Sequence, residues 1–398
     1  MMRSKLILPV IIISQFCCTS LWFASNGVIT DLVINYNLQH SALGHLTSAV
    51  QAGFIFGTLS FAVFTIADRF SPSKVFFVCS GIGAIFNLGI IFEGNTLTSL
   101  VFLRFLTGFF LAGIYPIGMK IAADYFKKGL GKSLGFLVGA LVIGTAFPHL
   151  LKNITETISW KSVLITTSLF ALFGGVLMLT LVPDGPFRKP GKKINLLAFS
   201  QVFRNPEFRS SAFGYFGHMW ELYAFWTFVP IILTNYKAKY AQIDFNISIW
   251  SFIIIAVGGL ACIIAGYLSQ KLGTKRTAFL SLLFSCGCCL ISPFMFSIES
   301  DLIFLSFLLF WGMVVIADSP LLSTLVAQNA PNEIRGTALT IVNCIGFSIT
   351  IISIQLISKM QAITEVNNIY MILALGPILG LIAIRQKNKK TQNKTEAL

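Results

Sequence analysis

Charged residues are scarce in this sequence. Asp, Glu, Lys and Arg make up only 11% of its 398 residues, against roughly 25% in an ordinary soluble domain. This scarcity excludes a water-soluble globule, and a hydrophobic content of 55% excludes a disordered chain. The apolar residues run for about 20 positions at a time without alternating with polar ones, which excludes an outer-membrane β-barrel and predicts helices that span a membrane.

Histidine is also rare, and cysteine is missing from the places where it forms disulfides. The four histidines are too scattered to suggest a zinc site, and all eight cysteines fall inside apolar runs, where we expect no disulfide. Cys286 and Cys289 have a helical spacing that is compatible with a soft metal, but packing between helices is the simpler interpretation. Because no complete phosphate-binding loop or hydrolase motif is present, we predict neither an enzyme nor a bound cofactor or metal.

Twelve apolar runs predict an all-α polytopic membrane protein with twelve transmembrane helices. They lie near residues 7–29, 41–66, 75–93, 98–119, 133–151 and 161–182, and then near 211–234, 246–268, 277–297, 301–327, 337–358 and 367–384. The sequence therefore predicts an N-terminal six-helix bundle, a polar linker, a C-terminal six-helix bundle and a basic tail, with boundaries at 1–182, 183–210, 211–384 and 385–398.

The distribution of basic residues predicts the orientation of these spans. With both termini on the same side, 23 of the 29 Lys and Arg residues lie in segments of that side and five on the other. The positive-inside rule then places both termini in the cytoplasm. The net charge of +14 thus reflects topology and contact with anionic lipids. The basic residues are dispersed over short loops, so we predict no binding to nucleic acid.

The two predicted halves repeat each other at an offset of about 200 residues. Gly108 and Pro116 in the fourth run have counterparts in Gly312 and Pro320 of the tenth run, 204 residues later in each case. Duplication of a six-span unit is typical of secondary transporters, in which the substrate site lies between the two halves.

The loops and the fourth run resemble motifs of the major facilitator superfamily. The loop after the eighth run matches the loop signature of that family, except that Gln270 replaces an acidic residue; the matching residues are Gly266, Lys271, Gly273, Lys275 and Arg276. The loop after the second run retains Asp68 and Arg69 of the same signature. Arg104 and Gly108 resemble the Arg-x-x-x-Gly motif of the fourth span. The resemblance implies two pseudo-symmetric six-helix bundles, with the first, fourth, seventh and tenth spans around a central cavity.

Three charged residues at membrane depth are the main candidates for function: Arg104, Glu221 and Asp318. A charge at the centre of a membrane helix costs about 2.5–3.5 kcal/mol on insertion scales. Such charges are expected to face a wet cavity or each other. A purely structural ion pair or a cap on a helix kink is the alternative interpretation.

Helical phase places other polar residues beside these charges. His218 and Glu221 share one face, and this pair is predicted to bind and release a proton, because imidazole titrates near neutral pH and burial disfavours a charged carboxylate. A hydrogen bond that only holds the helix in place is the alternative. Five further residues are expected to contact substrate together with Arg104: Trp22, Asn26, Tyr115, Trp311 and Asp318.

These observations lead to one predicted function and two alternatives. We predict a monomeric, proton-coupled transporter of a small organic solute in the inner (plasma) membrane, with protons, substrate and membrane lipids as its partners. The first alternative is a facilitator without ion coupling, in which the charges only preserve the shape of the cavity. The second is a membrane-embedded enzyme or sensor that acts on lipid, for which the sequence offers no reactive cluster.

Overall fold

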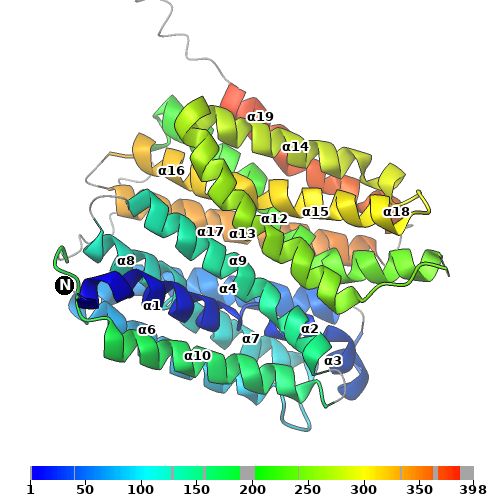
Figure 1. Ribbon diagram of the computed structural model, residues 1–398, viewed down its shortest axis with the longest axis horizontal. Helices are drawn as coiled ribbons and strands as arrows, with labels where there is room; N and C mark the ends of the chain where they lie inside the picture. Colours follow the sequence, from blue (N-terminus) through cyan, green and yellow to red (C-terminus); the bar gives the residue numbers. More distant parts are fainter. Residues whose placement is uncertain are drawn as a thin grey trace, which may run out of the picture.

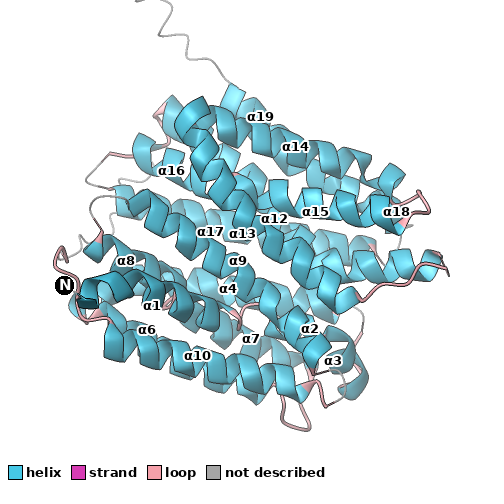
Figure 2. Ribbon diagram, in the orientation of Figure 1, coloured by secondary structure: helices cyan, strands magenta, loops and turns pink. Residues whose placement is uncertain are grey.

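The computed structural model describes residues 2–39, 41–126, 130–155, 158–188, 202–240, 242–331, 334–361 and 366–385. Within these ranges every regular element is a helix (Figure 2). The central part of the predicted linker, residues 189–201, and the predicted tail from residue 386 onward lie outside the described residues. The division of the chain at residues 183–210 therefore stays a prediction.

The first half contains the helices α1 to α10. Their bounds are α1 Met2–Thr19, α2 Ala24–Gly27, α3 Ile29–Asn35, α4 Ala42–Val63, α5 Ile66–Arg69, α6 Pro72–Gly89, α7 Leu97–Leu111, α8 Tyr115–Tyr125, α9 Leu130–Ile154 and α10 Lys161–Leu181. The second half contains α12 Pro206–Lys239, α13 Ile247–Leu272, α14 Thr274–Met295, α15 Asp301–Ala317, α16 Ser319–Asn329, α17 Arg335–Met360, α18 Val366–Ile369, the 3₁₀ helix η1 Tyr370–Ala374 and α19 Leu375–Arg385.

The helices are long and apolar enough for a membrane protein with many spans. Nine helical segments within the described ranges can cross a membrane by length and composition, and the apolar helices Leu6–Thr19 and Tyr370–Arg385 are shorter. The remaining span is α12, the longest helix at 34 residues, which buries His218 and Glu221. Together these segments form the twelve spans expected from the sequence.

Two pairs of helices make the main contacts between the two halves. In Figure 1 the first half lies below and the second half above, and α9 packs on α13 while α4 packs on α17 between them. Gln355 of α17 donates a hydrogen bond of 2.8 Å to Ser48 of α4, so this interface includes a polar contact. Gly139 and Gly259 bring α9 and α13 close together, because the position of a Cβ at residue 259 lies 3.4 Å from the carbonyl oxygen of Gly139.

The two halves of the sequence repeat also make equivalent contacts between helices. A Cβ at Gly108 would lie 2.1 Å from the carbonyl oxygen of Val50, and a Cβ at Gly312 would lie 2.1 Å from that of Ile254. Both members of the second contact lie 204 residues after those of the first. Small residues permit such close approach of membrane helices. The same helix crossing is therefore built twice, once in each half.

Among the described residues, turns interrupt three of the spans. Prolines occupy the first turn of α8 and α16, where the missing N–H costs least, and the preceding helices α7 and α15 end just before them. The two breaks are repeats of each other, since Tyr115 begins α8 and Ser319 begins α16, 204 residues later. The first span, expected as one apolar run over 7–29, is also divided, because α1 ends at Thr19 and α2 begins at Ala24.

Candidate functional site

Arg104 donates hydrogen bonds to the turn between α1 and α2, where the first span is broken. Its Nη1 donates to the carbonyl oxygen of Leu21 at 3.0 Å and to Oδ1 of Asn87 at 3.3 Å, and its Nη2 donates to the carbonyl oxygen of Trp22. Both carbonyls lie in the turn between α1 and α2, where the carbonyl oxygen of Leu21 also accepts from the N–H of Ala24 at 3.5 Å, and the guanidinium adds a donor to each. The side chain is 0% exposed. Arg104 was expected to contact substrate, which stays a prediction; in this conformation both terminal nitrogens bind the protein itself.

Asn87 extends this network to a further helix. Its Nδ2 donates to Oγ of Ser168 on α10 at 2.9 Å, while its Oδ1 accepts from Arg104. The sequence analysis did not single out Asn87, although an asparagine inside the apolar run 75–93 was a visible signal. The contact joins α6, α7 and α10 to the break in the first span.

Glu221 lies in a pocket of neutral donors from two other helices. Its Oε1 accepts hydrogen bonds from Nε1 of Trp311 at 2.7 Å, from Oγ of Ser285 at 2.5 Å and from Sγ of Cys289 at 3.2 Å. Glu221 is 1% exposed. Trp311, expected to contact substrate, thus has its N–H directed at this carboxylate. Cys289 was interpreted as a packing residue, and Ser285 was not considered.

His218 pairs with Asp318. Its Nδ1 lies 2.8 Å from Oδ1 of Asp318, and both side chains are 1% exposed. The two atoms are at ion-pair distance, and neither carboxylate oxygen of Asp318 has a hydrogen-bond partner among the described residues. The joint role of His218 and Glu221 in binding a proton stays a prediction. The two residues share the buried face of α12, but His218 reaches the junction of α15 and α16, whereas Glu221 reaches α14 and the middle of α15.

An aromatic cluster joins the two halves beside the break in the first span. The ring of Trp22 lies 4.8 Å from that of Phe54 on α4, 5.8 Å from that of Tyr223 on α12 and 5.8 Å from that of Phe347 on α17. The ring of Trp226 is 5.4 Å from that of Tyr223. The predicted substrate residue Trp22 is therefore placed at the centre of the molecule, between helices of both halves.

The two remaining residues predicted to contact substrate also lie in the interior. Asn26 is 3% exposed, and its Nδ2 donates to Oγ1 of Thr47 on α4 at 2.9 Å. Tyr115, at the start of α8, is close enough to Tyr215 and Tyr223 of α12 to interact with them electrostatically. Tyr115 thus lies near the second half. No observation here tests whether either residue touches substrate.

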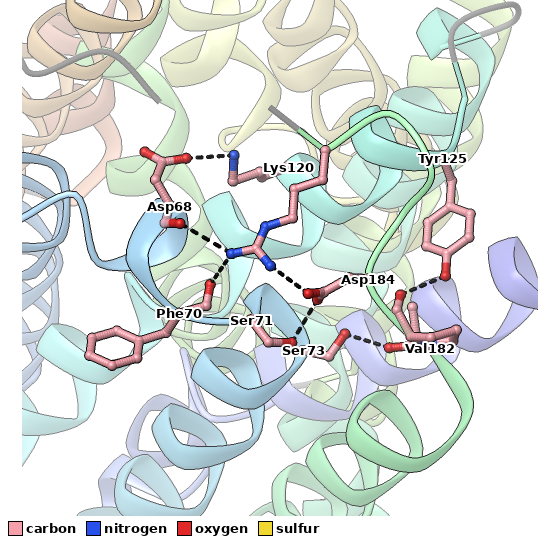
Figure 3. Close-up of polar contacts among 10 residues, drawn as sticks. Asp68, Phe70, Ser71, Ser73, Lys120, Tyr125, Val182 and Asp184 are labelled. Atoms are coloured by element: carbon pink, nitrogen blue, oxygen red, sulfur yellow. Dashed lines mark hydrogen bonds and ion pairs between the residues drawn. The ribbon is translucent and has the colours of Figure 1, made fainter. Parts of the chain in front are cut away.

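The first loop motif is part of a polar cluster at one end of the bundle (Figure 3). We call this end, which holds Asp68, Lys120, Asp184 and Arg188, the basic end. Asp68 pairs with Lys120 of α8 at 2.8 Å, and Nη2 of Arg188 donates to the carbonyl oxygens of Asp68 at 3.1 Å and Phe70 at 2.7 Å. Arg188 also forms an ion pair with Asp184. The loop after α4 is thereby tied to the segment that follows α10.

The serines at the start of α6 strengthen the same cluster. Oγ of Ser71 donates to Oδ1 of Asp184 at 2.7 Å, and Oγ of Ser73 donates to the carbonyl oxygen of Val182 at 2.6 Å (Figure 3). Ser71 stands where the family signature usually has glycine. Arg69, the other predicted motif residue, follows Asp68 in the short helix α5 and ends it.

The second loop motif lies at the turn between α13 and α14. Gly273 has φ +86°, a left-handed conformation that favours glycine. Nζ of Lys275 lies 3.9 Å from a carboxylate oxygen of Glu207 on α12. Lys271 and Arg276 flank the same turn, in the last turn of α13 and the first turn of α14.

A cavity of about 310 Å³ opens beside this second motif. It is lined by residues of four helices, which include Gly135 and Phe136 of α9, Cys262, Gly266 and Gln270 of α13, Thr274 of α14 and Pro320 of α16. The lining therefore comes from both halves. Gly266 and Gln270 of the second loop motif are among the residues that line this cavity.

A comparison of the sequence with models of protein families agrees with this fold. Residues 11–354 match the sequence model of the Major Facilitator Superfamily. The chain belongs to this superfamily. No curated protein matches its sequence. As a member of the superfamily, the protein is a multi-pass membrane transporter of small solutes and not an enzyme.

Several solved transporters have a similar fold. A D-xylose–proton symporter is 16% identical with a TM-score of 0.76, over 96% of this chain and 97% of that one. The nucleoside transporter NupG is 15% identical with a TM-score of 0.74, over 96% and 98%. A bacterial homologue of the human lysosomal transporter Spinster, inward-facing and unoccupied, is 14% identical with a TM-score of 0.68, over 96% and 94%. At these identities the likeness shows the shared fold.

Proposed function

We propose that this protein is a proton-coupled secondary transporter, in which Glu221 carries the proton. The observation that supports the proposal most directly is the surroundings of its carboxylate. Glu221 is 1% exposed, and the three groups that donate to its Oε1, from Trp311, Ser285 and Cys289, are all neutral. Binding a proton therefore removes a buried charge that has no cation among these partners.

The partners of Glu221 suit both protonation states. A serine hydroxyl can donate to a carboxylate and can also accept from a carboxylic acid, so protonation reverses the contact with Ser285 instead of breaking it. The indole of Trp311 can only donate. Because Ser285 belongs to α14 and Trp311 to α15, a change in the charge of Glu221 alters how α12 is held by both helices. This gives the proton a physical connection to movement of the second half.

His218 and Asp318 form a second candidate proton site. Their contact of 2.8 Å ties α12 to the junction of α15 and α16. Asp318 is also close enough to Glu221 for the two carboxyl groups to interact electrostatically. We propose that this pair responds to the charge of Glu221 and that the solute binds near Trp22, Asn26 and Tyr115.

The proposal includes an orientation and a compartment. We place the basic end and both termini in the cytoplasm, because basic residues concentrate on the side that carries the termini. We also propose that the protein lies in the inner (plasma) membrane as a monomer. Rocking of the two halves about the interior site would expose it to either side in turn.

Substituting Glu221→Gln is expected to abolish substrate-driven proton movement. Glutamine keeps the size of the side chain but cannot exchange a proton. The purified protein is reconstituted into vesicles, solute is added, and the external pH is recorded. D-xylose and uridine are the first solutes to test, because transporters of similar fold carry a pentose or nucleosides. The unsubstituted protein is expected to move protons with the solute that it carries, whereas the variant should retain only exchange of labelled solute.

Glu93→Gln is the matched control, because the Glu93 side chain is 96% exposed in a loop between α6 and α7. This variant should behave like the unsubstituted protein. If the unsubstituted protein carries a solute without any pH change, proton coupling is rejected and the alternative of an uncoupled facilitator holds. Equal proton movement in the Glu221→Gln variant would reject the role given to Glu221.

A further inference from the structure

The cavity beside the second loop motif reaches the surface of the molecule. Its volume of about 310 Å³ lies at the lower end of the range for ligand sites. Among its lining residues, Gln270 and Thr324 are exposed, and the side chain of Tyr267 is 62% exposed. A Cβ at the lining residues Gly135 or Gly266 would meet nothing within 4 Å. The cavity therefore has room for a ligand that enters from outside.

The lining changes from polar to apolar along the helices. Ser269, Gln270 and Thr274 lie beside the turn at which α13 ends and α14 begins. Cys262 and Ile263 lie about two turns earlier in α13, toward the middle of the span. The cavity thus has a polar end at the helix terminus and an apolar end at greater depth. An occupant that matches both ends is amphipathic.

One side of the cavity continues into the outward face of α13. Leu260, Ile264 and Tyr267 follow one another at helical spacing and are 61%, 57% and 62% exposed. On a membrane helix, an exposed apolar stripe of this kind is a surface for lipid chains. Because Tyr267 belongs both to the stripe and to the lining, the cavity is continuous with the surface that faces lipid.

Basic residues flank the polar end, while none of the described residues that line the cavity is charged. Lys271 follows the lining residue Gln270, and Lys275 and Arg276 lie in the first turn of α14. Nζ of Lys275 lies 3.9 Å from Glu207, but the Lys275 side chain is still 47% exposed. With one acid against three bases, this edge keeps a positive charge and attracts anionic headgroups.

Gln270 makes the polar end compatible with an anion. The family signature that this loop resembles has an acidic residue at this position, and a carboxylate there would repel an anionic group. The chain instead has an exposed neutral amide that lines the cavity. The NH₂ group of this amide can donate a hydrogen bond to a phosphate oxygen.

We propose that this cavity binds an acidic phospholipid of the surrounding membrane. The phosphate lies beside Gln270 and the basic residues, and the first part of an acyl chain extends toward Cys262. Since Gly135 of the first half also lines the cavity, the lipid favours the arrangement in which α9 and α13 have this separation. The described lining includes none of the residues assigned above to solute or proton, so the inference does not depend on proton coupling.

The test measures stabilisation of the purified full-length protein by lipid. Thermal unfolding in a nonionic detergent is followed with dioctanoyl phosphatidylglycerol, with zwitterionic dioctanoyl phosphatidylcholine and with glycerol 3-phosphate. Phosphatidylglycerol is expected to raise the unfolding temperature at a concentration about fivefold lower than phosphatidylcholine does. Glycerol 3-phosphate should have no effect at these concentrations. Equal effects of the two lipids would overturn the proposal, and an equal effect of glycerol 3-phosphate would replace it with a site for free phosphate.

Gln270→Glu tests the polar end by introducing the acid of the family signature. We expect the apparent affinity for phosphatidylglycerol to fall about fivefold, because the carboxylate repels the phosphate. Gln242→Glu is the matched control, since Gln242 is exposed in the loop at the other end of α13 and the change in net charge is the same. Equal weakening in both variants would assign the effect to net charge and contradict the proposal.

Gly135→Leu tests the cavity without changing any charge. The added side chain occupies the space that the lipid needs, so stabilisation by phosphatidylglycerol should weaken at least about fivefold. The protein without lipid should not lose stability, because leucine favours a helix more than glycine does. Gly81→Leu on α6 is the control, since a Cβ there also meets nothing within 4 Å and Gly81 does not line the cavity. Full stabilisation of the Gly135→Leu variant by phosphatidylglycerol would reject this cavity as the site.

Discussion

Substituting Gly108→Ala is expected to reduce the stability of the folded protein by about 3 kcal/mol, at the upper end of the usual cost of overpacking. The added Cβ would lie 2.1 Å from the carbonyl oxygen of Val50 and 2.9 Å from its Cα. These atoms are backbone, so no rotation of a side chain can relieve the overlap, and α7 must move away from α4. Thermal unfolding in detergent, together with the yield of monodisperse protein, measures the effect.

The repeat provides a second test of the same contact. Gly312→Ala is expected to have a comparable effect in the second half, since its Cβ would lie 2.1 Å from the carbonyl oxygen of Ile254. Gly81→Ala and Gly287→Ala are matched controls, because a Cβ at either position meets nothing within 4 Å. Alanine favours a helix more than glycine does, so the controls should be neutral or slightly stabilising. Similar losses of stability in controls and test variants would refute the packing argument.

Substituting Arg104→Met is expected to destabilise the protein by about 3 kcal/mol, because three buried acceptors each lose a hydrogen bond from a charged donor at once. The acceptors are the carbonyl oxygens of Leu21 and Trp22 and the Oδ1 of Asn87. Methionine fills much of the same volume, so the loss measures the hydrogen bonds more than a cavity. Thermal unfolding in the absence of any solute reports this effect independently of transport.

Arg104→Lys separates the charge from the geometry. Lysine keeps the positive charge, but a single ammonium cannot reproduce the fork that reaches both carbonyls and Asn87. We therefore expect a loss of stability between that of the methionine variant and zero. If lysine restored full stability, charge alone would be the relevant property, and the role of Arg104 as a fork that binds the helix break would be wrong.

Much of the fold was predictable because it follows from the chemistry of a membrane. Apolar runs of about 20 residues predicted the spans. The breaks before Pro116 and Pro320 were not predicted, because the predicted runs 98–119 and 301–327 extend through both prolines. The Gly108 and Gly312 pair indicated the repeat, which the packing confirms at Val50 and Ile254. The break between Thr19 and Ala24 was not predicted, since hydropathy does not distinguish a helix from a turn inside an apolar run.

The site was predictable only in part. Charge inside an apolar run singled out Arg104, Glu221 and Asp318, and all three are buried at the interior. The neutral polar residue Asn87, in another apolar run, carried a weaker signal and was missed, because an amide costs less in a membrane than a charge does.

The sequence by itself determined the number of spans, their duplication and the presence of charges at membrane depth, because each depends on local composition or on a fixed spacing. Only the tertiary structure decided which groups meet. Helical phase placed His218 and Glu221 on one face, but a face of α12 contacts several helices, and a difference of three residues along it directs one side chain to Asp318 and the other to Ser285 and Trp311. Partners separated by 64 to 100 residues in the chain are brought together by the packing of helices, which no local pattern encodes.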